Sequence, residues 1–223
     1  MALIFPRWTN YVPLGLAAGA PLVLGSIVFA LWYWNSPSFT DVGYQPIQPV
    51  PFSHKLHAGD MGIDCRYCHN TVERGAGAAV PPTATCMNCH SKVQVESPRL
   101  AKVRESWETG KALEWVRVHM LPDYAFFNHS VHLAAGVGCK SCHGRVDQME
   151  IVTQAEPLSM GWCLDCHRNP GAHIRPPDVQ VTDMAWEPDG TERLTSHTLL
   201  PGQDPKTPGR PLVPPEHCSG CHR

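Results

Sequence analysis

Hydrophobic residues gather at the start of the chain. Arg7 is the only charged residue among the first 40, and residues 11–34 form an uncharged stretch of 24 residues. A helix of that length can cross a bilayer. Aromatic residues flank the stretch on both sides, as they do at membrane–water interfaces: Phe5, Trp8 and Tyr11 before it, Trp32, Tyr33 and Trp34 at its end. The pattern predicts an N-terminal membrane anchor over residues 1–40, with its helix at about 11–34.

A cleaved secretory signal is the alternative interpretation of this segment. Ala18-Gly19-Ala20 resembles a signal-peptidase site. The apolar stretch before that site is short, however, and a second apolar stretch follows it. We therefore favour an uncleaved single-pass anchor, in which Pro13 and Pro21 are tolerated as prolines are in other membrane helices.

The remainder of the chain is polar and rich in proline, which favours irregular connections over long helices or a broad sheet. Residues 41–51 contain three prolines and are expected to form a semi-rigid linker. Ser97-Pro98 is typical of a helix start, with Leu100, Val103 and Trp107 as its apolar stripe and Gly110 as its stop. Residues 114–121 alternate in places and are expected to run extended. The predicted fold is mostly irregular with short α-helices.

Cysteine spacing defines the chemistry. All ten cysteines fall in five C-x-x-C-H motifs, at residues 65–69, 86–90, 139–143, 163–167 and 218–222, here numbered motifs 1 to 5. This element is the attachment signature of c-type haem. Zinc sites or thioredoxin-like pairs are the alternative, but histidine makes up only 13 of 223 residues, so it would not follow five such pairs by chance. We expect five covalently bound haem c groups, attached through Cys65, Cys68, Cys86, Cys89, Cys139, Cys142, Cys163, Cys166, Cys218 and Cys221, with His69, His90, His143, His167 and His222 as proximal iron ligands.

The chain contains an internal repeat. Phe52-Ser-His-Lys-Leu-His precedes motif 1, and Phe127-Asn-His-Ser-Val-His precedes motif 3. Because motifs 2 and 4 follow at similar offsets, residues 52–167 are interpreted as a tetrahaem region made from a duplicated two-haem unit. Residues 168–223 form a proline-rich arm that carries motif 5. The haems are expected to fill the core of this domain.

Eight further histidines are available for the distal faces of the irons. We expect His54, His57, His129 and His132 of the repeat to be distal ligands, with His119 as the fifth. His173 is held in reserve, and His197 and His217 are interpreted as loop residues. Met149 or Met160 is the alternative for one iron, and a methionine ligand would raise its reduction potential. The sequence does not decide which distal ligand serves which haem.

Irons with both axial positions closed transfer electrons but do not readily bind substrate. Neither a C-x-x-C-K motif nor a catalytic constellation of carboxylates or nucleophiles is apparent, so we expect an electron-transfer protein without catalytic residues or a small-molecule substrate of its own. The net charge of −2 argues against nucleic-acid binding. Since c-type haem is attached outside the bacterial cytoplasmic membrane, the domain after residue 40 is expected on the periplasmic side.

The anchor, the five motifs and three local runs together resemble the pentahaem cytochrome c subunit of alternative complex III. The runs are Trp115–His119, Phe127–His132 and Pro157-Leu-Ser-Met-Gly-Trp-Cys163. The resemblance implies a bacterial inner-membrane complex that oxidises quinol and passes electrons to a periplasmic cytochrome or copper protein, and on to an oxygen reductase. It implies as partners an iron–sulfur subunit related to molybdopterin enzymes, multi-helix quinol-site subunits and a monohaem cytochrome c.

Three alternatives compete with this hypothesis. A stand-alone quinol dehydrogenase cytochrome also begins with one anchor, but the fifth motif on a proline-rich arm departs from its tetrahaem pattern. A multihaem reductase would need one iron with an open face, for example at His222, which has no Phe-x-His-x-x-His ahead of it. A structural role would make the anchor and arm assembly elements, with some haems too remote to conduct.

Overall fold

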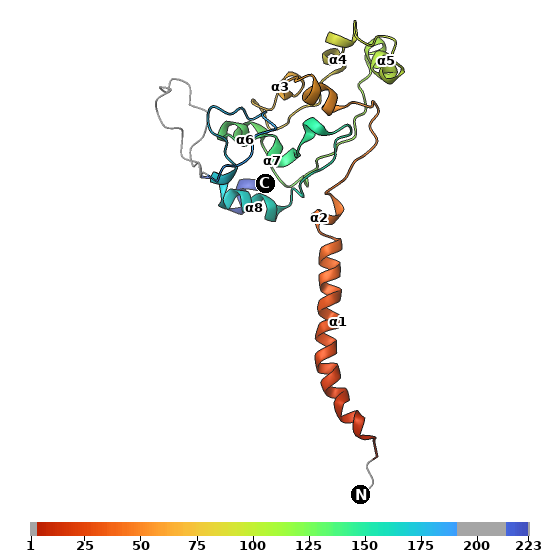
Figure 1. The fold of residues 1–223 in the computed structure, drawn as a ribbon, viewed down its shortest axis with the longest axis vertical. Coiled ribbons are helices and arrows are strands. Elements are labelled where there is room, and N and C mark those ends of the chain that lie inside the picture. The colour runs from red at the N-terminus through yellow and green to blue at the C-terminus, as the bar shows by residue number, and fades with distance from the viewer. Residues whose placement is uncertain (1–3, 191–212, 223) are drawn as a thin grey trace. The chain divides into compact units, whose positions relative to one another are not determined.

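The computed structural model describes residues 4–190 and 213–222 (Figure 1). The chain divides into two compact units, Met1–Val42 and Gly43–Arg223. His197, interpreted above as a loop residue, lies outside the described residues. The two units are taken separately below.

The first unit is almost entirely helical. A 3-10 helix, Arg7–Tyr11, leads into α1, Val12–Trp34, and α2, Pro37–Thr40, follows. Pro13 lies in the first turn of α1, where its missing N–H costs nothing, and Pro21 lies inside the helix. Within the described residues, the span Arg7–Trp34 is the one helix long and apolar enough to cross a membrane. The helix expected at about 11–34 is therefore present almost residue for residue.

The second unit consists of short helices joined by irregular segments. Its α-helices are α3 Cys65–Cys68, α4 Thr83–His90, α5 Ala101–Thr109, α6 His129–Ala135, α7 Lys140–His143, α8 Met160–Arg168 and α9 Cys218–Cys221. A π-helix covers Lys55–Asp60, and 3-10 helices cover Pro98–Leu100, Val146–Gln148 and Pro170–His173. The described residues form no sheet, and their only β pairing is two isolated bridges, Ala125 with His222 and Val137 with Ile174. The predicted fold class is confirmed.

Helix α5 illustrates how the sequence sets a helix. Ser97 and Pro98 open the 3-10 turn that leads into it, and Gly110 ends it at φ 70°, a left-handed conformation that glycine adopts without strain. The predicted stripe is only partly buried, since Val103 is 2% exposed but Trp107 is 54% exposed. Helix α5 packs against α4, where the Thr83 and Ser106 hydroxyls are 2.6 Å apart. Residues 114–121, which were expected to be extended, form no strand.

Hydrogen bonds join residues 43–48 of the expected linker to the rest of the second unit. The Gly43 N–H donates to the Gln154 carbonyl at 2.8 Å, and the Gln154 N–H returns a bond to the Tyr44 carbonyl. Gln48 exchanges two bonds with the backbone of Val116. Residues 43–50 are therefore part of the folded domain and not a free spacer.

Candidate haem-binding site

Each C-x-x-C-H motif lies on a short helix or at a helix end. Helices α3, α7 and α9 are each one turn around their motif, motif 2 ends α4, and motif 4 lies within α8. One helical turn places the two cysteines on the same side, with the histidine immediately after them. Asp64 caps α3 by accepting from the Arg66 N–H, and Ser159 caps α8 by accepting from the Trp162 N–H. These caps fix the direction in which motifs 1 and 4 begin.

Most of the expected histidine ligands share one hydrogen-bond pattern. A metal-ligating histidine normally donates its second ring N–H to a carbonyl or carboxylate, which fixes the tautomer and leaves the other nitrogen for the metal. Seven of the expected ligands donate from Nδ1 to a backbone carbonyl at 2.6–3.1 Å, which leaves Nε2 available. The pairs are His57 with Ser53, His69 with Ala79, His90 with Val93, His129 with Ala76, His132 with Asn128, His167 with Pro215 and His222 with Tyr124.

Three pairs of histidine rings have the spacing of axial ligands. With metal–nitrogen bonds of about 2 Å, as imidazole forms in zinc sites, two imidazoles on opposite faces of one iron have ring centroids roughly 6.3 Å apart. The centroid separations are 6.2 Å for His57 and His90, 6.4 Å for His129 and His143, and 6.2 Å for His132 and His167. Each pair joins a histidine of the repeat to the proximal histidine of one motif.

The fourth histidine of the repeat, His54, lies close enough to His69 and His57 to interact with both rings electrostatically. Burial, followed by the proximity of these two rings, lowers the pKa of His54 to about 4. Loss of solvent also lowers the pKa of His143, to about 3, and that of His132. All three rings are therefore neutral at physiological pH, the form in which imidazole binds iron.

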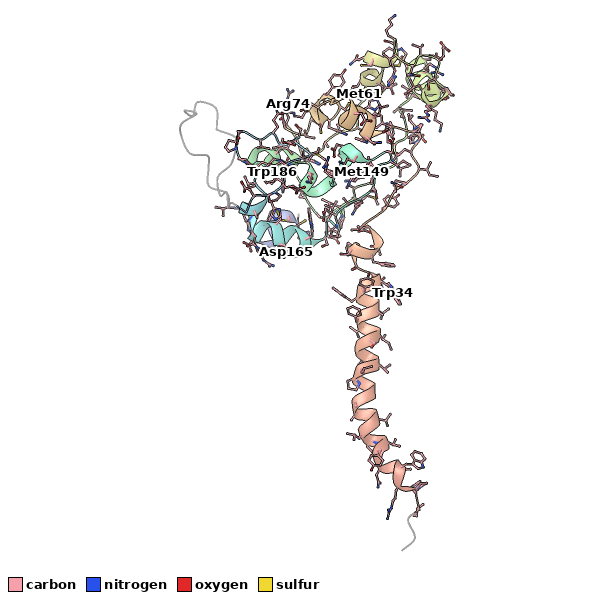
Figure 2. All side chains as sticks on the ribbon, in the orientation of Figure 1. Trp34, Met61, Arg74, Met149, Asp165 and Trp186 are labelled. Atoms are coloured by element: carbon pink, nitrogen blue, oxygen red, sulfur yellow. The ribbon has the colours of Figure 1, made fainter. Side chains whose placement is uncertain are left out.

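The other candidates occupy different positions. The Nε2 of His119 lies 3.3 Å from Nδ1 of His143, and the two rings are T-shaped with centroids 4.3 Å apart. Met149, which is labelled in Figure 2, lies beside motif 3 with its methyl group close to Gly144. Met160 is 62% exposed at the start of α8. His173 ends a 3-10 helix, and His217 is the N-cap residue of α9.

Contacts join the motifs in a fixed order. The Asn88 side chain of motif 2 donates to the Tyr67 hydroxyl of motif 1 at 3.0 Å. The Cys65 thiol of motif 1 lies within electrostatic range of the Cys139 thiol of motif 3. Both sulfur atoms would become thioethers if haem were attached at these motifs. Motifs 2, 1 and 3 are therefore neighbours in that order.

A short segment holds motifs 1 and 3 together. Within residues 180–182, the Val181 carbonyl accepts from the Cys139 N–H at 3.0 Å, and Thr182 donates to the Asp64 carboxylate at 3.1 Å. The Gln180 side chain accepts from Arg66 at 2.9 Å. The segment thus binds the N-terminal ends of both motifs at once.

Motifs 3, 4 and 5 follow on the other side. Cys142 lies within electrostatic range of Cys166 and Cys163 of motif 4, and Cys163 lies within range of Cys221 of motif 5. His167 of motif 4 donates to the Pro215 carbonyl, and the Arg168 guanidinium lies 3.6 Å from the Glu216 carboxylate. The Phe126 N–H also donates to the Cys221 carbonyl, so motif 5 is anchored to the segment before α6.

A buried cation that sequence reasoning missed lies beside motif 3. Arg175 is 1% exposed, donates from Nη2 to the Asp183 carbonyl at 2.8 Å, and has its guanidinium carbon 5.0 Å from the ring centroid of Trp186, which is labelled in Figure 2. A methyl group at Gly138 would overlap this guanidinium. Nothing in the local sequence marks Arg175, because Gly138 and Arg175 meet only through the bridge between Val137 and Ile174.

Taken together, the donors fit c-type haem. The Nε2 atoms of the seven carbonyl-bound histidines are available, three ring pairs have axial spacing, and the cysteines stand one turn apart on helices. No group of three or more histidine, cysteine or carboxylate side chains in the described residues is arranged to hold a bare metal ion. This donor set thus suits a ligand that is attached through cysteine and binds iron between two imidazoles.

Comparison with known proteins agrees with this chemistry. Residues 36–119 match the class III cytochrome c family. The chain is also 38% identical, over 126 residues, to the multiheme cytochrome c subunit of a menaquinone reductase from Nitratidesulfovibrio vulgaris strain Hildenborough. That alignment covers 56% of this chain and 58% of the relative, so the chain spans less than two-thirds of the relative's length. The finer resemblance to alternative complex III stays a prediction. Over the described residues the chain is mostly helical and irregular, forms no sheet, and has one apolar helix ahead of its cysteine-rich unit.

Proposed function

We propose that this protein is the electron-relay subunit of a membrane complex that reacts with quinone. The observation that carries the proposal is the set of three ring pairs at 6.2–6.4 Å, because these rings would close both faces of an iron held at motifs 2, 3 and 4. When bound, haem supplies a one-electron iron couple. The chain's part is to hold the axial imidazoles in one tautomer, exclude other ligands and set the spacing between sites.

The proposed pairing follows the repeat. In each half, the first histidine serves the first motif and the second histidine serves the second motif: His54 with His69, His57 with His90, His129 with His143 and His132 with His167. This assignment uses all four histidines of the repeat once. We also propose that all five motifs carry haem c, including motif 5 on the proline-rich arm.

The proposed relay runs through the motifs in the order 2, 1, 3, 4, 5. The contacts between Asn88 and Tyr67, between Cys65 and Cys139, and between His167 and Pro215 support this order. Because tunnelling rates fall steeply with distance, electrons would pass between neighbours and enter or leave at motifs 2 and 5. The chain order of the motifs therefore differs from their order in space.

For partners and location, we propose that α1 anchors the protein in the bacterial inner membrane, with the second unit on the periplasmic side. The resemblance to alternative complex III supports flow from quinol-oxidising membrane subunits to a periplasmic cytochrome or copper protein. The relative from Nitratidesulfovibrio vulgaris is named for menaquinone reduction, which is the opposite direction. Either direction uses the same relay.

Electron paramagnetic resonance of the oxidised, detergent-solubilised protein tests the proposal, with spins counted against haem content. We expect low-spin signals at motifs 1 to 4. A high-spin iron at any of those motifs that binds nitrite or carbon monoxide would overturn the relay and favour a reductase. Membranes containing the whole complex then decide the direction of electron flow. Menaquinol should reduce the haems if electrons flow from quinol to the periplasmic acceptor. If menaquinol does not reduce the haems but menaquinone oxidises reduced haems, the flow is toward quinone.

The order of the motifs has its own test. A Cys218→Ser, Cys221→Ser variant lacks the attachment at motif 5, and the order predicts that only the reduction potential at motif 4 shifts in response. A matched variant of motif 1, Cys65→Ser with Cys68→Ser, should shift potentials at both motif 2 and motif 3. A shift at motif 2 in the first variant would contradict the order.

A further inference from the structure

The proximal histidine of motif 3 departs from the pattern of its counterparts. At motifs 1, 2, 4 and 5 the proximal Nδ1 donates to a backbone carbonyl. At motif 3, Nδ1 of His143 instead faces Nε2 of His119 at 3.3 Å. The hydrogen-bond partner of His143 is thus a side chain, which can be replaced by mutation, whereas a backbone carbonyl cannot.

His119 is too close to His143 for the two rings to lie across one iron. Their centroids are 4.3 Å apart, whereas rings that share an iron need roughly 6.3 Å with metal–nitrogen bonds of about 2 Å. His129 already occupies the axial spacing, at 6.4 Å from His143 with the ring planes within 8°. The geometry therefore gives the distal position of motif 3 to His129 and leaves a different role for His119.

We propose that His119 is a positioning residue for motif 3, whose Nε2 accepts a hydrogen bond from Nδ1–H of the proximal ligand His143. Sequence reasoning expects His119 to be a distal ligand, and this assignment replaces that expectation. The proposal rests on the proposed function, since it needs haem at motif 3. The Arg117 side chain supports the position by donating to the His119 carbonyl at 3.0 Å.

The consequence is a lower reduction potential at motif 3. A hydrogen bond that draws the Nδ1 proton makes the imidazole a stronger electron donor. A stronger donor stabilises ferric iron more than ferrous iron, so the bond favours the oxidised form.

Three variants test this assignment in the full-length, detergent-solubilised protein. His119→Ala removes the acceptor, His119→Gln restores one through its amide oxygen, and His129→Ala removes the proposed distal ligand. We expect His119→Ala to keep every iron that is low-spin in the wild type low-spin, to bind no more carbon monoxide than the wild type, and to raise one midpoint potential. A tenfold change in the reduction equilibrium corresponds to 59 mV for one electron. His119→Gln should return most of the shift, while His129→Ala should give one high-spin iron that binds carbon monoxide.

Each contrary result has a separate meaning. A new high-spin iron in His119→Ala would show that His119 is a distal ligand, and unchanged potentials in that variant would show that the contact has no effect on the iron. Both results overturn the proposal. Failure of the proposed function is seen independently, because the wild type would then lack the low-spin signals of motifs 1 to 4 before any substitution is made.

Discussion

Gly138→Ala is the sharpest test of the packing beside motif 3. Gly138 immediately precedes Cys139, and a methyl group there would overlap the guanidinium of the buried Arg175. The backbone around it is fixed on both sides by the bridge from Val137 to Ile174 and by the bond from the Cys139 N–H to Val181. The arginine must therefore move, since the glycine cannot.

The cost follows from the contacts that Arg175 would lose. Its charged hydrogen bond to the Asp183 carbonyl contributes about 1.5–3 kcal/mol. Its position over Trp186 adds a cation–π interaction worth about 0.5–2 kcal/mol. Because the arginine recovers part of both interactions when its side chain shifts, we expect the free energy of unfolding to fall by about 2–4 kcal/mol. For a domain of this size that corresponds to a decrease in Tm of roughly 5–10 °C.

Thermal unfolding followed by circular dichroism measures this loss, after haem content has been shown to match the wild type. Gly161→Ala is the matched control, because a methyl group at Gly161 meets nothing within 4 Å and alanine favours its helix. In an Arg175→Ala background, Gly138→Ala should cost less than about 1 kcal/mol, which isolates the coupling between the two positions. A Gly138→Ala protein within about 0.5 kcal/mol of the wild type would refute the reasoning.

Three further predictions concern the histidine pair at motif 4, the cap of α3 and the removal of the first unit. His132→Ala should produce one high-spin, carbon monoxide-binding iron at motif 4, seen by electron paramagnetic resonance, while His173→Ala should not; a wholly low-spin His132→Ala protein would contradict the pairing with His167. Asp64→Ala should lower the free energy of unfolding by about 1 kcal/mol through loss of the α3 cap. The hydrogen bond from Arg66 lowers the pKa of Asp64 to about 2, below its ordinary value, so the stabilisation by Asp64 is complete above about pH 4 and disappears as the pH falls toward 2. Denaturant titrations of the wild type and Asp64→Ala should therefore give free energies of unfolding that converge at the acid end of this range. A difference between the two proteins that does not change with pH would contradict this prediction. A protein beginning at Gly43, exported behind a cleavable signal peptide, should stay in the aqueous fraction with its haem content unchanged, whereas the full chain should need detergent; loss of haem from the exported protein would show that the first unit is needed for the second.

Local structure was largely predictable from the sequence, because its determinants are close together along the chain. The uncharged run gave the bounds of α1, and Ser97, Pro98 and Gly110 gave those of the helical segment around α5. The cysteines of every motif lie on or beside a helical turn, as covalent attachment requires. Burial was less predictable, since Trp107 fits the stripe of α5 yet is 54% exposed.

Long-range pairing was not predictable. The repeat identified His57 and His132 as candidate ligands, but nothing in the spacing showed that each would face the second motif of its own half. The carbonyl acceptors of the histidines are backbone atoms, which leave no trace in side-chain identity. His119 was singled out by histidine supply alone, and only the structure shows its contact with His143.

The apolar content of the second unit explains why its contacts converge on the motifs. Its buried hydrophobic residues in the described part of the chain are Val50, Val72, Val103, Ile174 and Met184. Helices of four residues, such as α3, α7 and α9, do not form alone, because helix nucleation is unfavourable and short helices depend on tertiary packing. We therefore expect the histidine rings and cysteines of the motifs to pack on covalently attached haem. The second unit should accordingly fold only with haem attached, and under the proposed function the same ligand set would form its core and carry its electrons.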